Sequence, residues 1–480
     1  MPFMTEQSGK SSKHQNPFKN RVKNQVKNGG KGSNRNAPRS SRRKQSAATP
    51  ARQVALDLLD AVMTRGLPLQ NSIEAEPRYT QLDPRDRRFC RRLVSIALRH
   101  HGEAHAVISR HVKSMPKGRN HKAGLILIMA AAELMTGEAS PHAVVDQSVR
   151  LAHHHGCGHL GGLINAVLRK ITPADMPSAP MLNLPPWLRQ SLITDWGEAT
   201  AASIAAMMMQ PPPLDLRPKT SPEQNSSSDL QGLAETLGGV VTPHGSVRLN
   251  DGVVTSLSGY DEGRWWVQDA AASLPALLLG ALAGETVVDL CAAPGGKTAQ
   301  LCDTGADVLA VDAAAQRMGR LKQNMSRLGF TPQLITADGT SWQPPQPVDR
   351  VLIDAPCSAT GTIRRRPDIL CHQDAPDLDR LNALQRDLLK AAVTMLKPGG
   401  VCVFATCSIL KAEGEAITAT PPPGLEPLPI GDDELSGFRR HPGTPPHAVR
   451  LMPDALELKD NIIQGNDGFF IARFRRIQEG

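Results

Sequence analysis

Two cysteines in the C-terminal half of the chain stand where two predicted strands end. Cys357 belongs to Asp354-Ala355-Pro356-Cys357, after a predicted strand over 351–354, and Cys407 belongs to Thr406-Cys407-Ser408, after a predicted strand over 401–406. The carboxyl ends of parallel strands meet at one edge of a sheet, so both thiols are expected to face the same crevice. A thiolate is a strong nucleophile, and amide donors in a loop lower the pKa of a thiol.

Methylation of a pyrimidine at carbon 5 is a reaction that needs such a thiolate, because that carbon is not nucleophilic by itself. A thiolate that adds to carbon 6 creates an enamine that attacks a methyl sulfonium, and Asp354 would stabilise the adduct at ring nitrogen 3. A second cysteine would assist the loss of the carbon 5 proton that expels the thiolate. The alternative role for either cysteine is a small apolar residue at a strand end. Cys402, inside the predicted strand, is interpreted in that way.

A glycine-rich loop follows the predicted strand over 287–290. Its residues are Cys291, Ala292, Ala293, Pro294, Gly295, Gly296, Lys297 and Thr298. The two glycines let the backbone approach a ligand closely, whereas Cys291 could pack behind the loop. A Walker loop needs glycine where Cys291 stands, and the dinucleotide pattern G-x-G-x-x-G is absent, so the loop fits neither class.

Carboxylates follow the next predicted strands. Asp312 ends the strand over 308–312, at 23 residues beyond Asp289, which is near the spacing at which a carboxylate meets ribose hydroxyls in doubly wound folds. Asp338 ends the strand over 334–338 and is placed to face a base. Each aspartate alone could simply end its strand, since Asp is common in turns. Three such aspartates after successive strands, Asp312, Asp338 and Asp354, favour a nucleotide-like ligand.

The elements around these loops alternate between strands and helices. Helices are predicted over 317–328 and 378–396, and another over 269–284 leads into the region. This alternation predicts an α/β domain over 266–480 with a mainly parallel sheet covered on both faces. Apolar residues at helical spacing predict an all-α domain over 51–171, in which Asp83 caps a helix that begins at Pro84. Residues 172–265 read as a proline-rich linker, one helical stretch over 187–209 and a small α+β region with a polar loop over 221–229.

The positive charge of the chain is concentrated at one end. The net charge is +9, and residues 1–50 alone carry twelve Lys and Arg and one acidic residue, so the remainder is slightly acidic. This segment has too few apolar residues to form a core and is expected to be disordered. It suits an anionic polymer bound through phosphates, or it serves only as a solubilising extension.

Several classes of protein are disfavoured by composition. The longest apolar run, over 123–132, is half of the roughly twenty residues that a membrane-spanning helix needs, and the N-terminus lacks an export signal. Eight cysteines without a C-x-x-C pair do not form a disulfide framework. We therefore expect a cytoplasmic protein, and a monomer, without a membrane anchor.

Together these motifs resemble the RNA 5-methylcytosine methyltransferases of the Sun/Fmu (RsmB-like) group. The similarity runs in order through Gln268-Asp269, the loop over 291–298, Asp312 with Arg317, Asp338, 354–361, Arg365-Arg366-Pro367-Asp368, 396–400, 406–408 and 467–470. The helical region, which ends in Leu163–Arg169, is similar to the NusB-type RNA-binding domain of bacterial small-subunit rRNA enzymes. The resemblance implies a Rossmann-like methyltransferase domain after a NusB-like domain, and it favours ribosomal RNA over tRNA as the substrate.

The resemblance also implies roles for individual residues. S-adenosylmethionine is the implied methyl donor, without a metal, held by residues 291–297, Asp312, Arg317, Asp338 and Asp354. Cys407 matches the nucleophile of the family and Cys357 the cysteine that assists release. DNA cytosine methyltransferases instead use a Pro-Cys cysteine, which would be Cys357, and the second motif around Cys407 decides for RNA.

The chain departs from the family pattern at three places. Gly414 follows Glu413 where asparagine is usual, and Ala359 stands where glycine is usual. Pro218 ends a Leu-Arg-Pro segment where the family has a Leu-Arg-Val-Asn type, and this departure leaves the RNA contacts of residues 172–265 open.

Two further clusters invite a function. His153-His154-His155-Gly156-Cys157-Gly158-His159 fits no standard zinc spacing and is interpreted as a polar loop between helices. Arg364-Arg365-Arg366 is expected to contact RNA phosphates, although a solvated charge run is the simpler alternative. The competing functions are a tRNA or other RNA methyltransferase, a DNA cytosine methyltransferase, and a non-catalytic RNA-binding assembly or antitermination factor.

Overall fold

The computed structural model describes residues 48–175, 177–220, 227–458 and 462–478. The basic segment over 1–47, on which the predictions of disorder and RNA contact fall, lies outside these residues, as does the start of the predicted polar loop, 221–226. Ser227 and the residues after it belong to a helix, so the last part of that loop prediction is wrong.

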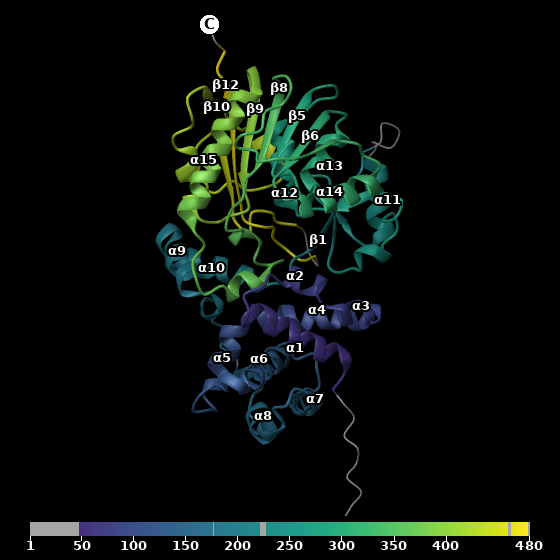
Figure 1. The fold of residues 1–480 in the computed structure, drawn as a ribbon, viewed down its shortest axis with the longest axis vertical. Coiled ribbons are helices and arrows are strands. Elements are labelled where there is room, and N and C mark those ends of the chain that lie inside the picture. Colours follow the sequence, from purple (N-terminus) through teal and green to yellow (C-terminus); the bar gives the residue numbers. More distant parts are fainter. Residues whose placement is uncertain (1–47, 176, 221–226, 459–461, 479–480) are drawn as a thin grey trace, which may run out of the picture. The chain divides into compact units, whose positions relative to one another are not determined.

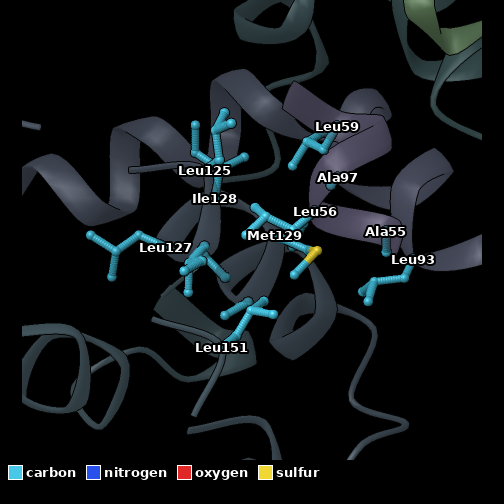
Figure 2. Packing of buried hydrophobic residues seen from close by; sticks show 14 of the residues in the cluster. Ala55, Leu56, Leu59, Leu93, Ala97, Leu125, Leu127, Ile128, Met129 and Leu151 are labelled. Carbon is cyan, nitrogen blue, oxygen red and sulfur yellow. The ribbon is translucent and has the colours of Figure 1, made fainter. Parts of the chain in front are cut away.

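The first part of the described chain is a helical bundle (Figure 1). Its helices are α1 (Pro50–Met63), α2 (Leu69–Glu74), α3 (Pro77–Gln81), α4 (Pro84–Arg99), α5 (His101–Ser109), α6 (His121–Met135), α7 (Pro141–His154) and α8 (Gly161–Leu168). Asp83 caps α4 by accepting a hydrogen bond from the backbone N–H of Asp86, as the sequence predicts. Figure 2 shows side chains from α1, α4, α6 and α7 that meet in one core, among them Leu56, Leu93 and Leu151. Because α6 lies at the centre, nearly all of its side chains are buried.

A smaller region joins the bundle to the large sheet. One helical stretch is predicted over 187–209, but Gly197, with a φ of 77°, divides it into α9 (Pro186–Trp196) and α10 (Glu198–Met208). An antiparallel sheet in the order β2-β3-β1-β4 follows, built from β1 (Leu214–Pro218), β2 (Val240–Val241), β3 (Val247–Leu249) and β4 (Trp265–Val267), with α11 (Ser227–Leu237) against it. Pro218, one of the departures from the family pattern, is the last residue of β1.

The C-terminal part is a doubly wound α/β domain. Its sheet has the order β10-β12-β9-β8-β5-β6-β7, and β11 pairs with β12. The strands are β5 (Thr286–Leu290), β6 (Asp307–Asp312), β7 (Gln333–Thr336), β8 (Val348–Asp354), β9 (Leu396–Thr406), β10 (Leu425–Pro427), β11 (Ala448–Leu451) and β12 (Phe469–Arg476). Strands β5 to β9 pair parallel with one another, whereas β12 pairs antiparallel with β9, and β10 and β11 pair antiparallel with β12. The five predicted strands are confirmed, although β7 ends at Thr336 and leaves Asp338 beyond it.

Alternation along the strands builds two cores, because successive side chains of a strand point to opposite faces of the sheet. Val403 and Ala405 of β9 face α12 (Ala270–Leu279), whereas Cys402 and Phe404 face α15 (Leu378–Met395). Helices α13 (Gly296–Asp303) and α14 (Ala315–Leu328) connect β5 to β6 and β6 to β7, and α16 (Glu415–Thr418) follows β9. Figure 1 shows β12, β9, β8, β5 and β6 side by side.

The strand order places the functional loops at a topological switch point. The chain leaves β5 towards β6 and β7, and later adds β8 and β9 on the other side of β5. The crevice at such a point, beyond the carboxyl ends of the strands, is where doubly wound sheets bind ligands. The loops after β5 and β8 therefore flank one position, and the loop after β9 lies beside them.

Candidate active site

The two cysteine sulfurs lie together at the edge of the sheet. Cys357 Sγ and Cys407 Sγ are 3.4 Å apart, and both side chains are partly exposed. The parallel pairing of β8 with β9 sets Asp354 opposite Ala405, so the two loops leave the sheet at the same level. The hydrogen bond with Cys407, together with burial, raises the pKa of the Cys357 thiol well above its usual value. Cys357 therefore stays protonated at neutral pH.

The other cysteines confirm the predicted contrast. Cys402 is fully buried between β9 and its neighbours, and burial raises the pKa of its thiol to about 12. Cys291 packs at the edge of the same core, and burial raises the pKa of its thiol to about 12 as well. Neither thiol is a nucleophile at neutral pH, and all eight cysteines are free.

The loop after β5 forms a tight turn that ends in a helix. The loop begins at Cys291, with a φ of 61°, and Gly295, with a φ of 104°, precedes the first residue of α13. A side chain at Gly295 would be strained in this left-handed conformation, and an added Cβ would lie 3.1 Å from Leu321. The amide of Asn324 holds the carbonyl of Pro294 at 2.9 Å. The turn leaves main-chain groups facing the crevice, as a nucleotide-like ligand requires.

Asp312 is the carboxylate most firmly held at this edge. It is almost fully buried, accepts hydrogen bonds from the backbone N–H groups of Ala293 and Ala314, and pairs with Arg317 at 2.9 Å. One side chain thus joins the loop after β5 to the loop after β6. This arrangement fits a carboxylate that meets ribose hydroxyls, the position at which doubly wound folds place an acidic residue.

Asp338 and Asp354 have different surroundings. Asp338 is exposed and accepts hydrogen bonds from the backbone N–H and hydroxyl of Thr340, which lower the pKa of its carboxyl. Asp354 pairs with Lys297 Nζ at 2.7 Å, and that ammonium also lies 5.2 Å from the centroid of the Phe469 ring. The Lys297–Asp354 pair connects the glycine loop with the first cysteine loop, so these two loops adjoin.

Two buried acidic residues, to which the sequence analysis assigned no role, complete the site. Glu413 is fully buried and accepts hydrogen bonds from Ser358 of one cysteine loop and Ser408 of the other. Asp467 pairs with Arg365, whose charge also interacts with Cys407, and burial raises the pKa of the Asp467 carboxyl to about 6. Glu413 lies between Ala412 and Gly414, with the charged residues Lys411 and Glu415 beyond them, and its burial in the fold shows that it is not a surface charge.

The prediction for the arginine run is wrong at its first member. Arg364 is buried, and its guanidinium donates to the carbonyl oxygens of Pro211 and Gln464, so it cannot contact phosphates. Its own carbonyl accepts a hydrogen bond from the buried Arg99 at the end of α4. Arg365 and Arg366 are exposed and remain able to meet an anion.

The histidine-rich cluster divides between a helix and a loop. His153 and His154 lie in the last turn of α7, and His155–Cys157 form the connection that follows. Within the described parts of the chain no group of three metal-ligating side chains could hold a metal ion. The same residues include no helix that is both long and apolar enough to cross a membrane.

Comparisons with known proteins agree on both parts of the chain. The family described as "16S rRNA methyltransferase RsmB/F" matches residues 276–475, and the NusB family matches residues 49–173. The ribosomal RNA small subunit methyltransferase B of Xanthomonas campestris pv. campestris is 33% identical over 417 residues, which cover 83% of this chain and 95% of that protein. The protein of the same name from Vibrio cholerae is 32% identical over 422 residues, 81% of this chain and 95% of that protein.

Solved structures share the fold. The crystal structure of PH0851 superposes with a TM-score of 0.68 at 21% identity and covers 90% of this chain and all of that chain. NSun6 from Pyrococcus horikoshii, solved with SFG, gives a TM-score of 0.52 at 18% identity over 62% of this chain and 99% of that chain. These two likenesses support the Rossmann-like methyltransferase architecture, and the sequence relatives establish the relationship. The chain belongs to the RsmB/F family of small-subunit ribosomal RNA methyltransferases.

Proposed function

We propose that this RNA methyltransferase transfers a methyl group to carbon 5 of a cytosine in small-subunit ribosomal RNA, through a transient bond between Cys407 and the base. The observation that carries the proposal is the pair of sulfurs 3.4 Å apart beside the glycine loop after β5. A methyltransferase that acts on a nitrogen or an oxygen needs no thiol, and one cysteine would suffice for addition alone. Two adjacent cysteines suit a reaction that forms a carbon–sulfur bond and must later break it.

S-adenosylmethionine, the methyl donor of this proposal, supplies a methyl group on a sulfonium. The residues at the edge of the sheet fit such a group, since Gly295 and Gly296 bring main chain to the crevice and the buried Asp312 offers acceptor oxygens to a ribose. Lys297 and Asp354 close the side of the crevice next to the cysteines. We assign residues 291–297, Asp312, Arg317, Asp338 and Asp354 to donor binding.

The proposed steps balance around one cytosine. The Cys407 thiolate adds to carbon 6 while ring nitrogen 3 takes up a proton from water and donates a hydrogen bond to the Asp354 carboxylate, so that carbon 5 becomes electron-rich. Carbon 5 then forms a bond to the methyl group while the donor leaves as a neutral thioether. Loss of the carbon 5 proton to water restores the double bond, breaks the sulfur–carbon 6 bond and releases Cys407 as a thiolate, and ring nitrogen 3 returns its own proton to water. Cys357, in hydrogen-bond contact with Cys407, assists this last step.

We assign RNA contact to the helical bundle as well as to the crevice. Arg85, Arg88, Arg91 and Arg92 lie exposed on α4, while its opposite face is buried in the core. Such a stripe of guanidinium groups suits phosphates. The end of the same helix donates from Arg99 to the carbonyl of Arg364, next to the exposed Arg365 and Arg366. A cytoplasmic site of action agrees with a ribosomal substrate.

The test of the proposed function is a comparison of substrates. Methyl incorporation from labelled S-adenosylmethionine would be measured on naked small-subunit rRNA, tRNA and duplex DNA, followed by nucleoside analysis. We expect 5-methylcytosine in the rRNA alone. Methylation of tRNA or DNA would reject the substrate assignment, and a methylated nucleoside other than 5-methylcytosine would reject the cysteine mechanism. Absence of both methylation and donor binding would favour the non-catalytic assembly factor.

A further inference from the structure

A buried carboxylate lies behind the two cysteine loops. Glu413 has no exposed surface and belongs to the short helical turn Lys411–Glu413 after the Cys407 loop. Its Oε1 accepts from the backbone N–H of Ser358 at 2.8 Å, and its Oε2 accepts from the hydroxyls of Ser358 and Ser408, the latter at 2.7 Å. Ser358 follows Cys357 and Ser408 follows Cys407 in the chain. One carboxylate is therefore bonded to the residue next to each cysteine.

Further hydrogen bonds extend this arrangement to the surrounding elements. Gln385 of α15 donates to the carbonyl of Pro356 at 2.9 Å and to Glu413 Oε1 at 3.4 Å. Thr406 Oγ1 donates to the main-chain carbonyl of Glu413 at 2.9 Å, which fixes the turn to the end of β9. Thr360 Oγ1 lies 3.1 Å from Ser408 Oγ and accepts from the backbone N–H of Ile409. Among the described residues, the hydrogen bonds to the carboxylate oxygens are all donations, and they compensate the charge of Glu413.

The backbones of the two loops also meet directly. Gly361 N–H donates to the carbonyl of Cys407 at 2.9 Å, and a Cβ at Gly361 would lie 2.9 Å from the same oxygen and 2.0 Å from the carbonyl of Gly468. This close approach of the two backbones fixes how far the loops extend beyond the sheet. The direction of the cysteine side chains then depends on the residues that flank the cysteines. Those flanking residues are the partners of Glu413.

We propose that Glu413 is a positioning residue that holds the Cys357 and Cys407 loops in register, so that the two sulfurs face the same substrate ring. It touches no substrate in this role, which rests on the proposed function of the cysteine pair. The negative charge of Glu413 also contributes to the raised pKa of Cys357, which favours the neutral form of that thiol.

The first test separates positioning from general stability. Glu413→Gln keeps the size of the side chain but replaces one acceptor oxygen by a donor, so the hydroxyls of Ser358 and Ser408 lose their common partner. We expect kcat for RNA methylation to fall about 100-fold, the cost expected for a reacting group displaced by about 1 Å. The KM for S-adenosylmethionine should stay within about twofold. Glu413→Asp keeps the charge on a side chain one methylene shorter and should recover part of kcat.

The matched control is a buried carboxylate far from the cysteines. Glu133 of α6 is buried and accepts two hydrogen bonds of 2.6 Å from Arg52 of α1. Glu133→Gln should lower the melting temperature while leaving kcat within about twofold. An equal loss of kcat in both Gln variants would overturn the positioning role, because destabilisation alone would then account for it. If Glu413→Gln does not fold, Ser408→Ala removes the contact of Glu413 with the Cys407 loop, together with the bonds of that hydroxyl to Ser358, Thr360 and the Leu410 N–H, and carries the same comparison.

A second readout does not depend on methylation. Diamide, a two-electron oxidant of thiols, takes up two electrons and two protons as the two sulfurs bond, and peptide mapping gives the rate at which the Cys357–Cys407 disulfide forms. We expect fast closure in the parent and closure at least fivefold slower in Glu413→Gln. Equal closure rates and equal kcat in the two proteins would overturn the inference. Slower closure in the variant of a parent that methylates no cytosine would support the positioning role while rejecting the proposed function.

Discussion

The proposed donor side of the crevice, formed by the loops after β5 and β6, adjoins the cysteine side, formed by the loops after β8 and β9. The two sides are held in different ways. After β5 and β6, the backbone itself turns at Cys291 and Gly295, and Asp312 holds main-chain N–H groups of both loops. After β8 and β9, side chains hold the loops, through hydroxyls that converge on the buried Glu413. The donor side therefore depends on one buried carboxylate that holds main chain, whereas the cysteine side depends on a hydroxyl network, in which the loss of one member leaves the others without a partner. The comparison predicts which substitutions weaken donor binding and which lower the rate of methylation.

The largest effect is expected on the donor side at Asp312. Asp312→Ala removes the acceptor for Ala293, Ala314 and Arg317 and, by the proposed role, the acceptor for a ribose. Hydrogen bonds to a charged group contribute about 1.5–3 kcal/mol each, so the Kd for S-adenosylmethionine should rise about 100-fold. Calorimetric titration of the parent and the variant with S-adenosylmethionine measures this Kd.

The matched variant is Asp338→Ala. Asp338 is exposed and bonds only within its own turn, so its loss should raise the Kd by about tenfold or less. If the two variants bind S-adenosylmethionine equally well, the difference in burial between the two aspartates does not decide donor affinity. The account of the donor side would then be wrong.

A smaller effect is expected at Gly414, on the cysteine side. A Cβ at this position would lie 2.6 Å from Arg450 Nη2 and 2.6 Å from Phe470 Cγ. Arg450 is fully buried, donates to the carbonyl of Ser408 and pairs with Glu415 at 2.6 Å, so it occupies the space that the usual asparagine of the family would need. Gly414→Asn should therefore destabilise the protein by about 1–3 kcal/mol, measured as a lower melting temperature.

Gly319 of α14 provides the control for this prediction, since a Cβ there meets nothing within 4 Å. Gly319→Asn should leave the melting temperature nearly unchanged. A Gly414→Asn protein as stable as its parent would show that Arg450 moves aside freely and does not hold the nucleophile loop.

The smallest effect concerns Ala359, the other departure near the cysteines. Ala359 has a φ of 57°, a left-handed conformation that costs a residue with a Cβ about 1–2 kcal/mol. Ala359→Gly should raise the free energy of unfolding by up to about 1 kcal/mol, since glycine loses some of this gain through its greater freedom in the unfolded chain. Ser436→Gly, at a φ of 51° in a remote turn, should give a similar gain. A gain at only one position would mean that local packing rather than backbone conformation sets the cost.

The strand-end loops could be predicted because their information is local. A short apolar run followed by a small or acidic residue marks the end of a buried strand, and the order of these runs fixes which loops meet at the edge of the sheet. The contrast between Cys402 and the two loop cysteines followed from their positions relative to the end of β9. The division of 187–209 was missed because Gly197 alone breaks an otherwise continuous helical pattern.

The support of the cysteine loops could not be predicted, because it depends on residues far apart in the chain. Gln385 and Glu413 meet Ser358 only after α15 and β9 have packed beside β8. Arg364 was misassigned for the same reason, since its partners at Pro211 and Gln464 lie about 100 residues or more away on either side. Charge in a sequence does not indicate whether the fold exposes it, and the burial of Arg364 is evident only from the carbonyl oxygens that it meets in the fold.

The most direct test of the central claim is the capture of the bond between Cys407 and RNA. The enzyme would be incubated with small-subunit rRNA and S-adenosylmethionine, then separated on a denaturing gel, for the parent, Cys357→Ser and the double variant Cys357→Ser, Cys407→Ala. We predict a slowly migrating protein–RNA adduct in Cys357→Ser, with the cytosine joined to the peptide that contains Cys407, and no adduct in the double variant. An adduct that survives the loss of Cys407, or a Cys407→Ala enzyme that methylates at the parental rate, would contradict the account.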